Sequence, residues 1–339
     1  MSHLNLVQIN TPAGERAALV RDNTLHVLSL GMYDLALKAA NQEVSIASLL
    51  DSHYTGETLD YDQTIAAGLI RPPITQPNAQ NTILSGTGLT HLGSAAPRNK
   101  MHAANKQDAA PKTDTAAAPV TKTDTQRMFE LGMEGGKGTL SNPGVAPEWF
   151  YKGTGDCVSA PFAPLTMPEF SLDAGEEAEL AGIYVISDAG KVFRVGYALA
   201  NEFSDHVTEK QNYLYLAHSK LRNCSFGPEI LVGELPEEVT GEVRLSRGDT
   251  VLWEHDFRSG EKHMCHSIEN LEYHHFKYDH FRKPGQLHVH FFGAAVLSFS
   301  EGIRMQAGDE ISISCNFMSR PLVNQVGITA LSPLSIQSL

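Results

Sequence analysis

The stretch GEEAELAGIYVISDAGKVFRVGYALANEF, residues 175–203, decides how this chain folds. Its apolar runs at 180–186 and 192–200 are separated by the turn sequence SDAGK, which predicts two adjacent buried strands. Period-two alternation in the first strand places Glu177 and Glu179 on one face, and Glu202 follows the end of the second strand. Two carboxylates on one buried face coexist only with a positive counter-charge.

Three carboxylates from two neighbouring strands would form an all-oxygen site of the kind that suits magnesium, manganese or calcium. The alternative is an exposed strand, because acidic residues two apart usually lie on a solvated face. If the strand is buried, Glu177, Glu179 and Glu202 become candidate metal ligands, and Glu176 should point away from them.

Composition and charge exclude several classes of protein. The chain has 339 residues, 42% of them hydrophobic, which is ordinary for a globular protein. A net charge of -13 argues against a nucleic-acid partner. The N-terminal sequence lacks a signal-peptide pattern and no apolar run reaches the length of a membrane span, so we expect no membrane association and a cytoplasmic protein. The cysteines show no CxxC spacing, which predicts four free thiols at Cys157, Cys224, Cys265 and Cys315.

The order of patterns along the chain predicts a small N-terminal α+β domain, residues 1–70, and a larger domain, residues 71–339. A helical pattern at 33–50 precedes a proline-rich linker at 69–81. A polar segment begins near residue 95, and we expect a flexible lid at about 95–146 that holds a helix at 124–131 with a Thr123/Gln126 capping box. From Trp149 onward, strand-like runs predominate, so the expected class is α+β, mostly β.

The order of short motifs resembles that of the fumarylacetoacetate hydrolase superfamily over most of residues 70–315. It is most similar to the branch called AraD1-like or GguC-like, which is associated with sugar-acid catabolism. The matching elements are RPPI (71–74), ILSGTGLTH (83–91), YKGTGD (151–156), MPEF (167–170), GEEAE (175–179), GYALANEFSDH (196–206), HSKLRNCSFGPEI (218–230) and AGDEISI (307–313).

This resemblance implies a fumarylacetoacetase-like mixed β-roll catalytic domain and a homodimer. It also implies a metal, Mg²⁺ or alternatively Mn²⁺ or Ca²⁺, on Glu177, Glu179 and Glu202. Catalytic or substrate-binding roles fall on five further residues: His91 as a mobile acid or base, Lys152 on the substrate carboxylate, Lys220 at the reacting centre, and Thr154 and Asp156 orienting the substrate. Turn formation explains Thr154 and Asp156 equally well.

Three positions depart from the pattern of the superfamily. Glu202 stands where the third ligand is usually aspartate, which keeps a carboxylate on a longer side chain. Asp205 and His206 replace a common arginine and aspartate, so we expect the loss of a cation that could hold a substrate carboxylate. Ser94 stands three residues after His91 in place of a glutamate, so a water-activating His–Glu pair is missing.

The implied chemistry uses a metal to stabilise the enolate of a 2-oxo acid. We expect a carbon–oxygen lyase (hydro-lyase) that dehydrates a 2-keto-3-deoxy sugar acid, a pentonate. The alternatives are a C–C bond hydrolase acting on a 2,4-diketo-3-deoxy sugar acid or other acylpyruvate, and a non-enzymatic sugar-acid binding protein. The missing His–Glu pair favours dehydration over hydrolysis, since a hydrolase needs a positioned base for water.

Two other segments could suggest different ligands. The histidine-rich tract at 274–292 contains His288 and His290 at strand spacing, which could bind a transition metal. The alternative is a strand with hydrogen-bonded imidazoles. The glycine-rich GMEGGKGT at 132–139 is not a phosphate-binding loop, because Leu131 and Gly138 occupy positions that require glycine and a hydroxyl residue.

Overall fold

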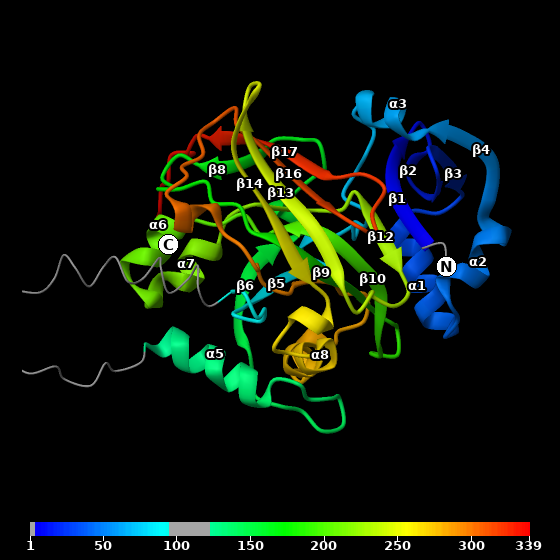
Figure 1. Cartoon of the computed structure of the whole chain (residues 1–339). Helices are drawn as coiled ribbons and strands as arrows, with labels where there is room; N and C mark the ends of the chain where they lie inside the picture. The colour runs from blue at the N-terminus through cyan, green and yellow to red at the C-terminus, as the bar shows by residue number, and fades with distance from the viewer. Residues whose placement is uncertain (1–3, 95–122) are drawn as a thin grey trace, which may run out of the picture.

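A computed structural model describes residues 4–94 and 123–339 of the protein (Figure 1). In these residues the strands form a twelve-stranded and a five-stranded sheet. The main path of the larger sheet is β4 (Tyr54–Asp60), β3 (Thr24–Leu28), β2 (Gly14–Arg21), β1 (Leu4–Thr11), β12 (Glu229–Val232), β10 (Val192–Asn201), β9 (Ala178–Ile186), β15 (Leu287–Phe291), β5 (Thr82–Gly88) and β6 (Glu148–Thr154), with β11 (Cys224–Phe226) and β7 (Val158–Ser159) beside it.

The smaller sheet and the helices complete the architecture. The order in the smaller sheet is β14 (Thr250–Ser259), β13 (Val239–Arg247), β16 (Glu310–Cys315), β17 (Leu322–Thr329) and β8 (Leu165–Pro168). The helices are α1 (Met32–Gln42), α2 (Ile46–His53), α3 (Tyr61–Ala66), α5 (Asp124–Gly135), α6 (His206–Gln211), α7 (Leu216–Lys220) and α8 (Ile268–Phe276). Both sheets combine parallel and antiparallel pairs, so the predicted α+β, mostly β class is confirmed.

The β9–β10 hairpin lies between two hydrophobic clusters. Ile183 and Ala200 belong to the cluster under α1, while Leu180 and Leu199 belong to the cluster shared with the smaller sheet. All nine residues of β9 are therefore buried, which explains why its sequence is apolar without alternation. The two adjacent buried strands that the sequence predicts are therefore present.

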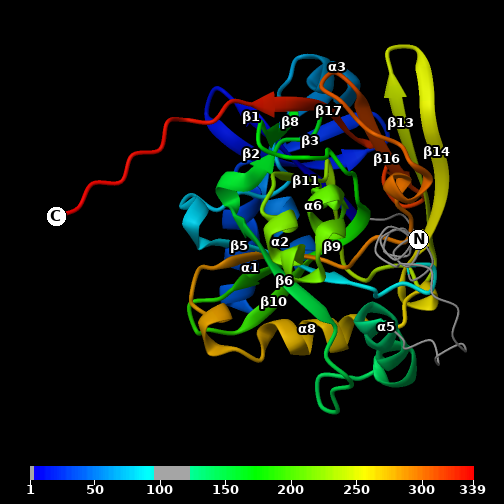
Figure 2. The same ribbon diagram turned by 90° about the vertical axis from the view of Figure 1, so that its left-hand side faces the viewer.

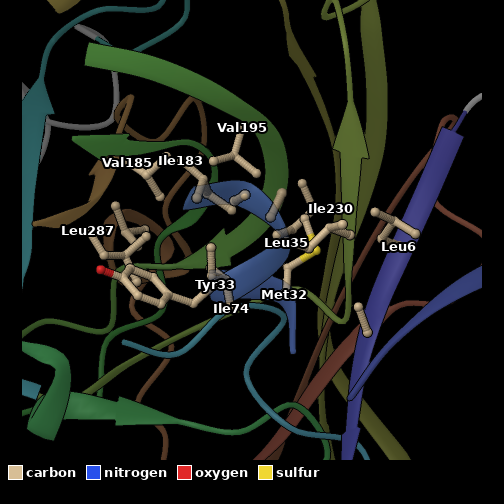
Figure 3. Packing of buried hydrophobic residues seen from close by; sticks show 14 of the residues in the cluster. Leu6, Met32, Tyr33, Leu35, Ile74, Ile183, Val185, Val195, Ile230 and Leu287 are labelled. Carbon is tan, nitrogen blue, oxygen red and sulfur yellow. The ribbon is translucent and has the colours of Figure 1, made fainter. Parts of the chain in front are cut away.

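Helix α1 covers the larger sheet and joins the N-terminal part of the chain to the rest. Figure 3 shows Met32 and Leu35 of α1 among Leu6, Ile183 and Leu287, which come from three different strands. Strand β1 also pairs with β12 of the larger domain. Sheet and core thus run across the predicted boundary near residue 70, and the division into domains at 1–70 and 71–339 stays a prediction.

One predicted helix is wrong in extent. The pattern at 33–50 predicts a single helix, but the structure has α1 and α2 in its place. Glu43 adopts a left-handed conformation with φ of 53° and ends α1, and the Ser45 side chain caps α2. The hydrophobic periodicity continues across this break because both helices pack their apolar residues into the same hydrophobic cluster.

Helix α5 confirms the predicted capping box, since Thr123 and Gln126 bond reciprocally to each other's backbone. It extends four residues beyond the expected end, to Gly135. Residues 95–122 of the predicted lid lie outside the described residues. The part at 136–146 is bound to α8, because Asn270 accepts from the Gly144 N–H at 2.8 Å and donates to the Val145 carbonyl at 2.9 Å.

Figure 2 shows α6 and α7 in front of the larger sheet, with α8 and α5 below it.

All four cysteines are free, as predicted. None of the helices in the described residues is long and apolar enough to cross a membrane.

Candidate metal centre and active site

Glu177, Glu179 and Glu202 meet at one end of the β9–β10 hairpin. Glu179 pairs with Ala200 across the hairpin, and the Glu202 N–H donates to the Glu177 carbonyl at 3.1 Å. All three side chains are buried and each offers a carboxylate oxygen within 4.8 Å of the other two. They continue the face of the hairpin that packs under α1, because odd positions of β9 and even positions of β10 share that face.

The donor set fits a hard divalent cation. Glu179 Oε2 accepts from the Gly293 N–H at 2.7 Å, but Glu179 Oε1 and Glu202 Oε1 are buried without a hydrogen-bond partner among the described residues. The backbone of Gly86 lies close to the Glu202 carboxylate: a Cβ atom added to Gly86 would lie 2.8 Å from Glu202 Oε1. Buried carboxylate oxygens without partners are costly unless a cation binds them. Carboxylate oxygens alone suit Mg²⁺, Mn²⁺ or Ca²⁺.

The pKa values of the three carboxyls reflect their crowding. Burial raises the pKa of Glu179 well above its ordinary value, and the charges of Glu202 and Glu177 add to the effect. Burial also raises the pKa of Glu202, to about 7, although Lys220 opposes the shift. Burial would raise the pKa of Glu177 too, but the adjacent Lys220 and His206 hold it well below the usual range. A divalent cation bound here would lower the pKa values of Glu179 and Glu202, because it stabilises their charged forms.

Lys220, at the end of α7, places its ammonium group against these carboxylates. Its Nζ donates to Glu177 Oε1 and lies 3.4 Å from Glu202 Oε2, over the ring of Phe150 at 4.9 Å from the centroid. Burial would lower its pKa, but the two carboxylates raise it above the ordinary value. Lys220 is therefore a protonated donor next to the candidate metal group, where the resemblance expects it.

His206, the first residue of α6, supplies a second cation that the sequence analysis missed. Its Nε2 lies 3.1 Å from Glu177 Oε1, and its Nδ1 lies 3.6 Å from Asp173 Oδ2. Burial would lower its pKa, but Asp173 and Glu177 raise it to about 10. Asp205 turns the other way and pairs with Arg222 at 2.9 Å. His206 and Arg222 both lie on carboxylates of this chain, so the expected loss of a cation that could hold a substrate carboxylate stays a prediction.

A small cavity adjoins the carboxylates and the two cations. Its volume is about 30 Å³, which has room for one or two water molecules. The lining combines charged side chains with backbone from glycine-rich turns. It comprises Thr87, Gly88, Leu89, Ser94, Phe150, Glu177, His206, Glu209, Lys220, Gly293, Ala294 and Leu297.

Lys152 lies behind the cavity and does not line it. The side chain is fully buried, and Nζ donates to the carbonyls of Phe203 at 2.8 Å and Lys220 at 2.9 Å. Burial lowers its pKa, while the charge of nearby Glu202 opposes that shift. The structure brings Lys152 close to the site as a link between the segments that carry Glu202 and Lys220.

The structure does not bring the other candidates to the cavity. His91 is buried, with Nε2 at 2.8 Å from Ser259 Oγ and Nδ1 at 3.1 Å from Thr90 Oγ1, and burial lowers its pKa to about 4. Thr154 pairs with Ile83 at the end of β6. Asp156 is exposed and accepts a hydrogen bond from Gln80.

Glu176 and the histidine-rich tract also have other partners. Glu176 accepts from the N–H and the hydroxyl of Ser298, so it points away from the metal group as expected.

The histidines of the histidine-rich tract bond to other residues of the protein. His275 and His288 share a hydrogen bond of 2.9 Å, and His290 bonds to the Ser85 hydroxyl at 2.8 Å. Within residues 4–94 and 123–339, the glutamates are the one group of three side chains that converges as a metal site. His275, His288 and His290 each make a hydrogen bond within the protein, while His288 Nε2 and His290 Nε2 are buried without a partner among the described residues.

Comparison with known proteins assigns the fold. No protein-family model matches the sequence, and a search of curated proteins finds no significant match. Among solved structures, a 2-keto-3-deoxy-D-arabinonate dehydratase complexed with magnesium and 2,5-dioxopentanoate matches with a TM-score of 0.68 and 19% identity, over 97% of this chain and 100% of that one. The chain has the fold of the fumarylacetoacetate hydrolase superfamily.

Two isomerase structures match less closely. A 5-carboxymethyl-2-hydroxymuconate delta-isomerase from Mycobacterium smegmatis has a TM-score of 0.56 and 15% identity, over 96% of this chain and 100% of that one. A 2-hydroxyhepta-2,4-diene-1,7-dioate isomerase from Mycobacterium marinum has a TM-score of 0.57 and 14% identity, over 96% and 98%. The fold predicted from the motif order is confirmed, and these identities leave the reaction to be argued from the site.

Proposed function

We propose that this protein is a metal-dependent hydro-lyase that dehydrates a 2-keto-3-deoxy sugar acid, with a pentonate as substrate. The observation that carries the proposal is the group of three buried carboxylates, two with unpartnered oxygens, beside the Lys220 ammonium at a small cavity. The similar structure of 2-keto-3-deoxy-D-arabinonate dehydratase contains magnesium and 2,5-dioxopentanoate, which supports this choice of substrate class.

In the proposal, Glu177, Glu179 and Glu202 hold Mg²⁺, with Mn²⁺ or Ca²⁺ as alternatives. Bound there, the metal would supply Lewis-acid stabilisation of the charge that develops on a chelated 2-oxo acid. Dehydration also requires a proton donor for the departing C4 hydroxyl, which Lys220 can supply from its position between two carboxylates. His206 on the cavity wall lies between Glu177 and Asp173, and its positive charge favours an anionic substrate in the cavity.

Lys152 has a different part in this proposal from the one the motif suggests. Since its ammonium group donates to the carbonyls of Phe203 and Lys220, it fixes the backbone that positions Glu202 and Lys220. In the conformation described, His91, Thr154 and Asp156 lie away from the lining of the cavity, so the proposal gives them no step.

Product identity separates this function from its alternatives. Purified protein with Mg²⁺ is incubated with 2-keto-3-deoxypentonate, and separately with an acylpyruvate, and the products are identified by ¹H NMR. We expect one water to be lost from the pentonate and a 2-oxo acid semialdehyde to form. Release of pyruvate from the acylpyruvate without dehydration of the pentonate would show the hydrolase. If neither substrate reacts, the remaining alternative is a non-enzymatic sugar-acid binding protein.

A further inference from the structure

The cavity contains one more charged side chain, Glu209, that the proposed chemistry does not yet use. Glu209 and His206 are three residues apart on α6 and therefore share a helix face. Both are buried, at 2% and 1% exposure, and both line the cavity with Lys220. The negative charge of Glu209 stabilises the Lys220 ammonium.

Contacts at the start of α6 fix the direction in which Glu209 points. Asp205 accepts from the Thr208 N–H at 2.9 Å and so caps the helix. The same carboxylate is bound by Arg222 and by the Leu172 N–H, each at 2.9 Å. Three partners on one capping residue hold the short helix in place, so the face that carries Glu209 is presented to the cavity.

Loss of water from a 2-keto-3-deoxy acid begins with removal of a C3 proton, which needs a base within reach of the substrate. Of the described lining residues, Lys220 faces the cavity as a donor, and His206 lies between Glu177 and Asp173. Glu177 belongs to the candidate metal group. Glu209 is the other carboxylate in the lining, on the side of Lys220 that faces α6.

We propose that Glu209 is the base that takes the C3 proton of the bound 2-oxo acid, an inference that rests on the proposed function of this cavity. The C3–H bond breaks, its electron pair moves into the C2 carbonyl, and the proton passes to a Glu209 carboxylate oxygen. The C4–O bond then breaks as the electron pair returns, and the hydroxyl leaves as water with a proton from Lys220. His206 and Glu209 are three residues apart, as His91 and Ser94 are, but here the second residue is a glutamate.

Deuterium exchange tests this step separately from dehydration. Pyruvate is incubated in D₂O with Mg²⁺ and the wild-type protein, and the loss of its methyl proton signal is followed by ¹H NMR. This exchange needs only reversible removal of a C3 proton. We expect Glu209→Gln to slow it about 100-fold or more, as is typical for loss of a catalytic base. Glu209→Asp should retain part of the rate, and the exposed Glu57→Gln serves as the matched control.

Calorimetric titration with Mg²⁺ accompanies the exchange measurement. Unchanged Mg²⁺ affinity in Glu209→Gln, together with the slow exchange, supports the assignment. Exchange by Glu209→Gln within about twofold of the wild-type rate overturns it, as does a wild-type protein that exchanges nothing. Exchange that depends on Glu209 supports its assignment as the base even if no semialdehyde forms from the pentonate. In that case the proposed dehydration is wrong.

Discussion

Glu179 has one carboxylate oxygen on the Gly293 N–H and the other turned toward Glu177 and Glu202. Glu179→Gln keeps the shape of the side chain and removes one of three crowded negative charges. We expect Mg²⁺ binding, measured by calorimetry, to be lost and kcat to fall at least 100-fold. The metal-free protein should unfold at the same temperature or higher, because like-charge repulsion is relieved.

Glu176→Gln is the control for this change, because Glu176 is equally buried but bonds to Ser298. It should bind Mg²⁺ as the wild type does. Undiminished Mg²⁺ binding by Glu179→Gln would remove Glu179 from the ligand set.

Lys220 and a metal ion compete for the same carboxylate oxygens of Glu177 and Glu202. In Lys220→Met, we therefore expect kcat/KM to fall at least 100-fold while Mg²⁺ affinity is kept or increased. Steady-state kinetics and calorimetry on the same preparation measure the two quantities. A large loss of Mg²⁺ affinity would mean that Lys220 supports the metal group structurally and does not act on the substrate.

The candidate metal ligands and Lys220 could be predicted from sequence because they lie beside regular strands or inside a dense motif. Period-two alternation places Glu177 and Glu179 on one face, and Glu202 follows the paired strand. His206 and Glu209 were missed because their direction depends on how Asp205 caps α6 and binds Arg222. The cap is local, but Asp205 and Arg222 are 17 residues apart in sequence, and the spacing of residues along the chain does not predict that they pair.

At the scale of elements, α8 and β15 bury a set of imidazoles that must stay neutral. His275, His288 and His290 are almost fully buried, and burial lowers the pKa of the last two to about 3. In the unfolded chain these groups bind protons below about pH 6.5. Stability is therefore present above that pH and is lost as the pH falls toward 3, by about 1.4 kcal/mol per pH unit for each histidine.

Urea unfolding of the wild type and His288→Leu at pH 7.5, 6 and 5 measures this effect. The free energy of unfolding should fall with pH in both proteins, and the slope between pH 6 and 5 should be smaller in the variant by about 1.4 kcal/mol per pH unit. Equal slopes would show that His288 is protonated in the folded protein.

Element boundaries show where sequence patterns fail. The β9–β10 hairpin was predicted because both of its faces are buried, which leaves long apolar runs on either side of a turn. The division between α1 and α2 was missed because the left-handed Glu43 interrupts the backbone without interrupting the apolar pattern. A left-handed backbone conformation is hard to predict from sequence at a residue other than glycine.

At the scale of the whole molecule, the resemblance predicts a homodimer. Several large apolar side chains remain exposed on one chain, including Phe170 at 54%, Leu172 at 56% and Leu214 at 81%. Exposed apolar surface favours association when it forms part of an interface. Light scattering coupled to size exclusion should give about twice the chain mass of 36.9 kDa. A mass equal to one chain at micromolar concentration would contradict the dimer.

Glu177, Glu179 and Glu202 are proposed to bind one divalent cation together. Crystals grown with Mn²⁺ test it most directly, because manganese scatters X-rays anomalously and substitutes for magnesium at oxygen sites. We expect an anomalous peak about 2.0–2.3 Å from one carboxylate oxygen of each glutamate. A peak elsewhere, or no peak at these carboxylates at millimolar Mn²⁺, would show that the three glutamates are not a metal site.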